Sequence, residues 1–225
     1  MSGVHPMRPV PRQERSRRTE HALLDAALAL FPERGVDAVT VADVATVAGV
    51  SPGSIYRRFG DKEGLLREAF ARFVDSTVAM LEALPPPPRS LGVVALAAEI
   101  TAQVVLFANA NQRLLQSSYA KALSDAFYAE RLVALRGRIL ERLRTQLRAH
   151  VDRIGHPEPE VAIDFALRQA TAMLSARVEA SRLEVGSSAM SDRVFLRELL
   201  RSLLAYLEVP ATATAIDRAL SARGL

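Results

Sequence analysis

The segment from residue 40 to 62 constrains the fold most, because it holds the start and stop signals of two short helices joined by a tight turn. Thr40 followed by Asp43 predicts a helix start, since a hydroxyl can accept from first-turn amides and a carboxylate favours the positive end of a helix. Gly49 predicts a left-handed residue that ends this helix. Ser51 is predicted to cap the next helix, with the following proline at its first position. These signals predict a helix-turn-helix, whose second helix is expected to enter a DNA major groove.

A longer ordered pattern surrounds this segment. In chain order it consists of Leu24, Asp25, Ala26, Ala27, Leu30, Phe31, Glu33, Arg34, Gly35, Thr40, Val41, Val44, Ala45, Ala48, Gly49, Val50, Ser51, Gly53, Ile55, Tyr56, Phe59, Lys62, Glu63, Leu65 and Leu66. With this pattern, residues 17–77 resemble the TetR family of bacterial transcriptional regulators. A bare helix-turn-helix pattern arises often by chance, whereas this extended set is specific. The resemblance implies a DNA-binding domain followed by a helical domain with a ligand pocket.

The side chains of the second helix are predicted to divide by direction. Ile55 and Phe59, four residues apart, are expected to point into the core of the small domain. The positions left to face solvent or DNA are Ser54, Tyr56, Arg57 and Arg58. Gly53 would let the backbone approach a base or phosphate closely, and Arg57 is the predicted guanine contact. The full set of predicted DNA-contacting residues is Thr40, Ser51, Pro52, Gly53, Ser54, Tyr56, Arg57, Arg58 and Lys62.

The resemblance implies that Thr40, Tyr56 and Lys62 contact DNA phosphates. Thr40 and Lys62 open two helices, whose free N–H groups and dipoles favour an anion. Each of the three residues also has a plainer interpretation: Thr40 as a helix cap only, Tyr56 as a packing residue and Lys62 as a solvated lysine. Their occurrence together in one motif favours the DNA-contact interpretation.

Charge and proline content divide the chain. Residues 1–18 hold five arginines and one glutamate, which suits either contact with a phosphate backbone or minor groove, or a solvated tail without a partner. We expect a basic disordered arm at 1–16, a DNA-binding domain at 17–77 and a ligand-binding and dimerisation domain at 78–225. The run Pro85–Pro88 is predicted to end a helix and to act as a stiff spacer.

Helical patterns account for the rest of the chain. Stripes at helical spacing predict helices over residues 17–34, 62–84, 90–108, 111–123, 124–151, 160–183, 191–207 and 216–223, besides the two of the helix-turn-helix. No strand-length alternation and no internal repeat is found. The predicted fold is therefore all-α, with an N-terminal three-helix helix-turn-helix domain, a larger C-terminal helical bundle domain and about nine to ten helices in total.

Composition limits the environment in which the chain works. It has no cysteine, which excludes disulfides and thiolate metal sites. The N-terminus lacks the apolar core of a signal peptide, so a cytoplasmic protein is expected. The longest apolar run, Leu91–Ala108, contains Glu99 and Gln103 and predicts a buried helix rather than a membrane span. No membrane partner is expected.

One helix-turn-helix makes too few contacts for selective binding, so a homodimer on an inverted-repeat operator is predicted. Helix 191–207 carries an apolar stripe too wide for one core-facing side, and helix 160–183 offers a second apolar face. The alternative is that both helices simply complete the core of a monomer. The predicted interface residues are Phe165, Leu174, Val178, Phe195, Leu199, Leu200, Leu203 and Leu204.

The resemblance also implies a pocket for a small apolar or amphipathic effector, walled by the helices from 62–84 to 160–183. Glu99 and Gln103 lie one turn apart in an otherwise apolar helix, and a buried carboxylate needs a partner. A ligand would supply that partner, and Arg168 or Arg177 would do so equally well. The candidate ligand-binding residues are Glu99, Gln103, Phe107, Gln116, Tyr119, Phe127, Tyr128, Phe165, Gln169 and Met173.

No enzyme motif of the GxSxG, HExxH, GxGxxG or P-loop type occurs, so no catalytic activity, cofactor or metal is predicted. His150 and His156 flank a loop and could meet a metal, but without a nearby third ligand no metal site is predicted there. The predicted function is that of a sequence-specific, ligand-responsive repressor. Three alternatives remain: a ligand-independent DNA-binding factor, an activator and, with less support, a helical enzyme.

Overall fold

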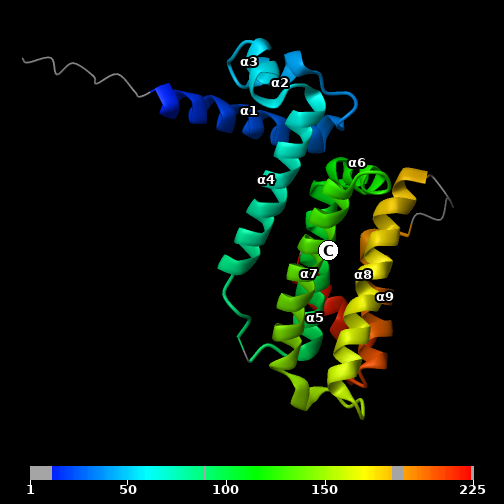
Figure 1. Cartoon of the computed structure of the whole chain (residues 1–225). Coiled ribbons are helices and arrows are strands. Elements are labelled where there is room, and N and C mark those ends of the chain that lie inside the picture. Colours follow the sequence, from blue (N-terminus) through cyan, green and yellow to red (C-terminus); the bar gives the residue numbers. More distant parts are fainter. Residues whose placement is uncertain (1–11, 89, 184–189, 224–225) are drawn as a thin grey trace, which may run out of the picture. The chain divides into compact units, whose positions relative to one another are not determined.

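The computed structural model describes residues 12–88, 90–183 and 190–223, and these residues form helices and connecting turns without any strand (Figure 1). The helices are α1 (Arg12–Arg34), α2 (Val41–Val47), α3 (Gly53–Phe59), α4 (Lys62–Ala83), α5 (Val93–Ala110), α6 (Gln112–Ala122), α7 (Ala126–Arg148), the 3-10 turn η1 (Val151–Arg153), α8 (Pro159–Leu183), α9 (Asp192–Tyr206) and α10 (Ala213–Ser221). The prediction of an all-α fold is confirmed.

The chain divides into two compact units, one ending at Phe73 and the other beginning at Val74. The division falls within α4, which runs unbroken from Lys62 to Ala83. It lies four residues before the expected boundary between 77 and 78. The first unit therefore contains α1 to α3 and the first half of α4, and the second contains the rest of α4 and α5 to α10.

The core of the first unit is built by apolar side chains from all four of its helices. Phe31 of α1, Ile55 of α3 and Phe70 of α4 are fully buried there. Ile55 points inward as predicted, and Phe59 is partly buried. An ion pair of 2.5 Å between Arg72 and Asp25 also joins α4 to α1.

The signals at the ends of the short helices act largely as predicted. Thr40 and Asp43 form a reciprocal capping box at the start of α2, and Gly49 has a φ of +66°, in the left-handed region. The Asp61 carboxylate accepts a bond of 2.7 Å from the Gly64 N–H and so caps α4. The prediction for Ser51 is wrong in detail: its backbone carbonyl accepts from the Ser54 N–H at 2.9 Å, and its hydroxyl caps nothing.

The first helix begins earlier than predicted, at Arg12 rather than residue 17. Residues 12–16 of the expected disordered arm are therefore helical, and residues 1–11 lie outside the described part. Glu14, in the first turn, forms a 2.6 Å ion pair with Arg18 one turn later, and both the pair and the helix dipole favour a helix start here.

The second unit has its core where α5, α8, α9 and α10 meet. The predicted assignment of four α9 leucines to a dimer interface is wrong, because the single chain already buries each of them to 6% exposure or less. They are Leu199, Leu200, Leu203 and Leu204. Three helices, α5, α8 and α10, pack against α9, so its wide apolar stripe is used within one chain.

Helix α5 is long and apolar enough to cross a membrane, as judged by length and composition alone. In the fold it packs against α9 and α10, and Leu96, Ala98, Ala102 and Val105 are buried in the core. This placement agrees with the prediction of a core helix. The apolar run is thus explained by packing within the second unit.

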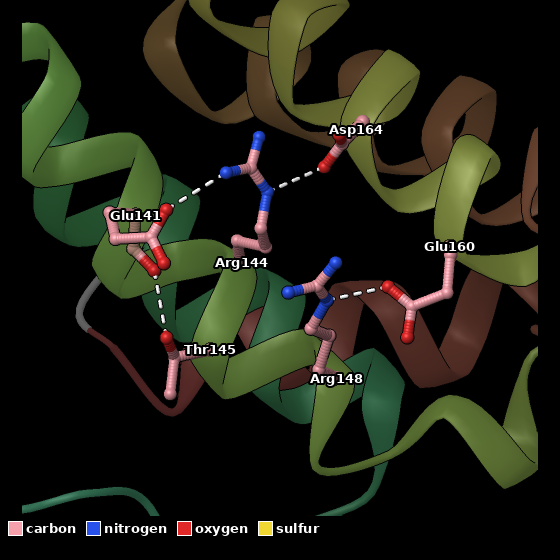
Figure 2. A network of polar contacts seen from close by, with 6 residues as sticks. All are labelled: Glu141, Arg144, Thr145, Arg148, Glu160 and Asp164. Carbon is pink, nitrogen blue, oxygen red and sulfur yellow. Dashed lines mark hydrogen bonds and ion pairs between the residues drawn. The ribbon is translucent and has the colours of Figure 1, made fainter.

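Ion pairs fasten α7 to α8 at the edge of this core (Figure 2). Arg144 bonds to Asp164 at 2.6 Å and to Glu141 at 2.8 Å, and Arg148 bonds to Glu160 at 2.5 Å. The hydrogen bond to Asp164 raises the pKa of the Arg144 guanidinium above its usual value. These groups are partly exposed, so the pairs fix how the two helices align more than they add to stability.

Candidate nucleic-acid interface and internal cavity

The leading end of α3 presents an exposed face of small and polar residues. Ser51, Pro52 and Gly53 are exposed, and so are Tyr56, at 57%, and Arg57. Ile55, between them, is completely buried, so it holds this face outward. The arrangement leaves the phenol of Tyr56 and the guanidinium of Arg57 exposed, where both can reach a partner outside the chain.

Ser54 and Arg58 do not face solvent as predicted. Ser54 is buried, and its hydroxyl lies 3.4 Å from that of Ser51 and accepts from Arg57 at 3.5 Å. Arg58 is partly buried and donates to the Ser54 carbonyl and to the Ser16 hydroxyl, both at 3.4 Å. Ser16 belongs to the part of α1 that was expected to be disordered, and its helical extension gives Arg58 a partner across the unit.

Thr40 and Lys62, at the start of two helices, already have partners within the chain. The Thr40 hydroxyl accepts from the Asp43 N–H at 3.1 Å and donates to the Asp43 carboxylate at 2.5 Å. This bond and the one from the Thr40 N–H lower the pKa of Asp43 below its usual 3.8. Lys62 Nζ donates to the Asp37 carbonyl at 3.2 Å. Thr40 therefore acts as a cap, and the phosphate contacts of both residues stay predictions.

Two glycines at this site differ in what the fold requires of them. A Cβ on Gly53 would meet no atom within 4 Å, so the fold of the chain does not need a glycine there. A Cβ on Gly64 would lie 1.9 Å from the Phe59 carbonyl oxygen. The end of α3 therefore leaves no room for a side chain at residue 64, in the first turn of α4. The missing side chain of Gly53 instead leaves open space beside the exposed end of α3.

Val47, at the end of α2, is 56% exposed and is not among the predicted DNA-contacting residues. Its neighbours Val44 and Ala45 are buried and define the inward face of that helix. Helical spacing from these two residues would have placed Val47 off the inward face. An exposed valine beside a recognition helix is suited to an apolar contact, such as a thymine methyl group.

The second unit encloses a cavity of about 150 Å³ lined by α5, α6, α7, α8 and α9. Most of the lining is apolar, from alanine, leucine, isoleucine, valine and phenylalanine. The polar lining residues are Thr101, Tyr119, Arg136, Thr171 and Ser175. The walls differ from the prediction, because α9 contributes and α4 does not.

Two of the ten candidate ligand-binding residues, Phe107 and Tyr119, line this cavity. The remaining eight are placed elsewhere in the second unit: Glu99, Gln103, Gln116, Phe127, Tyr128, Phe165, Gln169 and Met173. Tyr128 is wholly buried, Phe165 is 54% exposed and Gln169 donates to the Ser202 hydroxyl at 3.4 Å. Their expected role as cavity lining is corrected, because their helices turn these side chains into the core or out to solvent.

Glu99 has its partners within the chain. It forms an ion pair with Arg223, and the Gln103 side chain donates to its carboxylate at 2.5 Å. Neither Arg168 nor Arg177 takes this role, since Arg177 bonds to Asp192 at 2.5 Å. The carboxylate therefore needs no ligand as its counter-charge.

Four exposed apolar residues of α8 share one face of that helix with the exposed Arg168, while the exposed Met173 lies to one side of it. Val161 is 58% exposed and Phe165 54%, and Ala172 and Ala176 continue the same stripe at spacings of seven and four residues. Of the other predicted interface residues, Leu174 lines the cavity and Phe195 lies under Arg177, whose guanidinium carbon is 4.7 Å from the ring centre. The side chain of Val178 lies outside the described residues.

Residues 23–69 match the model of the bacterial regulatory proteins of the tetR family. The chain is 45% identical over 73 residues to the HTH-type transcriptional repressor KstR2 of Rhodococcus jostii, and 40% identical over 126 residues to KstR2 of Mycobacterium tuberculosis. These matches cover 31% and 50% of this chain, but only 35% and 60% of the two relatives. Residues 23–69 therefore form a DNA-binding domain of the TetR type.

A longer TetR-like match is to the HTH-type transcriptional regulator BetI of Rhizobium meliloti, 27% identical over 197 residues, or 86% of this chain and 84% of BetI. Among solved structures, a tetR-family regulator of Streptomyces coelicolor superposes with a TM-score of 0.61 at 18% identity, covering 92% of this chain and 86% of its own. Salmonella enterica GusR gives 0.55 at 22% identity, over 84% and 95%. The structural likeness confirms the TetR fold.

Proposed function

We propose that the chain is a transcriptional repressor that binds an inverted-repeat operator as a homodimer and leaves it when a small ligand enters the cavity. The observation that carries the proposal is the exposed face of α3, where the side chains of Tyr56 and Arg57 point outward while that of Ile55 is buried in the core. The surrounding residues match the TetR family model. The described residues contain no cluster of three or more potential metal ligands.

On the operator, the residues of this face take different parts. Tyr56, Thr40 and Lys62 contact phosphates and so position the domain, because phosphate contacts fix the register of a protein on DNA. Arg57 reaches a guanine edge in the major groove, where a guanidinium can bond to two acceptors of one base. Gly53 allows the backbone at the start of α3 to come close to the duplex.

The second copy of the chain binds through the exposed stripe of α8. Val161, Phe165, Ala172 and Ala176, with Arg168 among them, give each chain an exposed and mainly apolar face. Two such faces related by a twofold axis would cover each other. The dimer then places two recognition helices on one inverted repeat, and its presence on the operator blocks transcription.

Helix α7 links the cavity to α4. One side of α7 lines the cavity with residues such as Ile139 and Leu143. From another side Arg142 donates to the carbonyls of Leu84 and Pro85, at 2.7 and 3.3 Å, just after α4 ends. A ligand that shifts α7 would move the C-terminal end of α4. The same helix begins at Lys62, in the DNA-binding unit.

Selection of binding sites from random DNA with the purified full-length chain tests the proposal. We expect an inverted repeat, and Arg57→Ala should relax preference at one base pair of each half-site. Lys62→Ala should weaken all sequences alike and reduce the salt dependence of log K by about one. Arg153, exposed on η1 in the second unit, gives a control in Arg153→Ala. Recovery of no common sequence would refute the proposal.

A further inference from the structure

The chemistry of the cavity indicates what kind of ligand it can hold. Two of its five polar lining residues are already satisfied on their own helices. The Thr101 hydroxyl donates to the Ala97 carbonyl at 2.7 Å, and the Thr171 hydroxyl donates to the Leu167 carbonyl at 2.7 Å. Both hydroxyls are bonded to backbone carbonyls of their own helices, so the two threonines add little polarity to the cavity.

The polar groups left for a ligand are Arg136, with Ser175 beside it, and Tyr119. Arg136 Nη2 donates to the Ser175 hydroxyl at 3.2 Å, and Arg136 has no acidic partner among the residues that the structure describes. The Tyr119 hydroxyl likewise has no hydrogen-bond partner within the described part of the chain. Within the described part of the chain, the cavity therefore offers one positive charge without an acidic partner and one hydroxyl without a hydrogen-bond partner.

Arg136 occupies a place that helical packing would give to an apolar residue. Every other α7 residue that lines the cavity is a leucine or an isoleucine, among them Leu132 one turn before it and Leu140 one turn after it. Arg136 is exposed to solvent although it lines the cavity, so it stands at the opening. A charge at the mouth of an apolar chamber fits a ligand with a charged head and an apolar body.

We propose that the cavity binds an apolar monocarboxylate, with the carboxylate on Arg136 and Ser175, the Tyr119 hydroxyl as a further donor and the hydrocarbon part inside. This ligand class deepens the function proposed above and rests on it only for the release of DNA. A guanidinium pairs with a carboxylate through two parallel hydrogen bonds. One arginine with two hydroxyls balances a single negative charge, whereas a phosphate dianion would need more donors.

The size of the cavity sets the length of the hydrocarbon. A cavity of about 150 Å³ lined by leucine, isoleucine and phenylalanine holds a benzene molecule in another protein. The chamber here has the same volume and a similar lining. It would accommodate about six carbons, with the carboxylate outside them at the opening, which corresponds to an acid of about six to eight carbons.

Calorimetry and thermal shift with the full-length chain test this assignment. Octanoate is the probe, with 1-octanol, octylamine and octyl phosphate as analogues that share its tail. Octanoate should bind more tightly than all three. Between butanoate and octanoate the affinity should rise roughly fourfold with each methylene and then level off, because each buried CH₂ contributes a constant increment until the chamber is full.

Variants separate the charge from the chamber. Arg136→Met should weaken octanoate roughly ten- to a hundredfold and leave 1-octanol nearly unchanged, since only the charged hydrogen bonds are lost. Arg113→Met removes the same charge from an exposed site on α6 that does not line the cavity, so octanoate affinity should stay at its parent value. Ala170→Leu places three more carbons in the chamber and should weaken octanoate and 1-octanol alike.

The possible outcomes are distinct. Equal octanoate affinity in Arg136→Met and the parent, or tighter binding of octylamine or octyl phosphate than of octanoate, would overturn the assignment, as would the absence of octanoate binding. If octanoate binds, and its affinity falls as expected in Arg136→Met, the ligand class is supported. If octanoate nevertheless leaves operator binding unchanged, ligand-triggered release is refuted. If the analogues released the operator while octanoate did not bind to the protein, the ligand class alone would be refuted.

Discussion

Arg142 of α7 donates a hydrogen bond of 2.7 Å to the backbone carbonyl of Leu84, the first residue beyond α4. The last carbonyls of a helix have no partner within the helix and form its negative end, so a guanidinium there is doubly favoured. The contact makes the end of α4 depend on the position of α7. Since α7 also walls the cavity, it is the helix through which the proposed ligand would act on α4.

Arg142→Met should therefore weaken the coupling between ligand and DNA. We expect the free energy of unfolding to fall by about 1 kcal/mol, from the lost charged hydrogen bond at a partly exposed site. Operator affinity without ligand should change little, while the ligand-induced loss of affinity should shrink. Fluorescence anisotropy of labelled operator with and without ligand measures both, and Arg153→Met, at an exposed arginine of η1, is the control. An unaltered ligand effect would remove Arg142 from the coupling.

Gly53→Ala separates folding from DNA binding. A methyl group at this position meets open space, so the variant should be as stable as the parent or more stable by up to about 1 kcal/mol. Operator affinity should nevertheless fall about tenfold or more, because the methyl group blocks close approach of the backbone. Urea unfolding and anisotropy give the two quantities. Gly64→Ala is the contrast: it should lose at least about 1 kcal/mol of stability, since its Cβ would overlap the Phe59 carbonyl.

Phe165→Glu tests the exposed face of α8. A carboxylate in place of the ring would remove the apolar contact at the centre of the face and would have to be desolvated, so the dimer dissociation constant should rise by at least about a hundredfold. The monomer should keep its fold, since Phe165 is 54% exposed. Sedimentation velocity across a range of concentrations measures the change. Leu123→Glu alters a leucine that is 89% exposed after α6 and should leave the dimer intact; equal effects of both variants would argue against the α8 face.

The capping box of α2 gives a pH dependence of known sign. The bond from the Thr40 hydroxyl, followed by that from the Thr40 N–H, holds the pKa of Asp43 below 3.8 in the folded state. Stability from this carboxylate is therefore fully present above pH 3.8 and is lost as the pH falls through the lower folded-state pKa. Urea unfolding of the parent and Asp43→Asn should show a constant difference from pH 5 to 8 and a shrinking one below 3.8. A difference that grows in acid would contradict the assignment.

The sequence predicts features that depend on neighbours within one helical turn. Thr40 finds Asp43 three residues away, Asp61 caps the turn at Gly64, and Gly49 takes the left-handed conformation at the end of the first helix of the motif. Each of these contacts forms within a few residues and needs no knowledge of the rest of the fold. The helix-turn-helix, and with it the family, could be predicted for this reason.

Features that depend on distant partners were not predictable in the same way. Arg58 turns back because Ser16, 42 residues earlier, lies within reach. The α9 leucines are buried because α10 covers them along with α5 and α8, and a stripe alone does not show how many helices pack against it. Arg136 did leave a signal, since it interrupts an apolar stripe between Leu132 and Leu140, but five other arginines on the same helix obscured it.

The ion pair between Arg223 and Glu99 has a practical meaning for anyone who alters the tail of this protein. Glu99 sits on α5 between Ala97 and Ile100, both of which border the chamber. Clipping or displacing the turn that holds Arg223 would leave the Glu99 carboxylate with the Gln103 amide alone, on a helix whose neighbouring residues line the cavity. Affinity handles fused after Leu225 should accordingly be checked for altered ligand response before any effector screen begins.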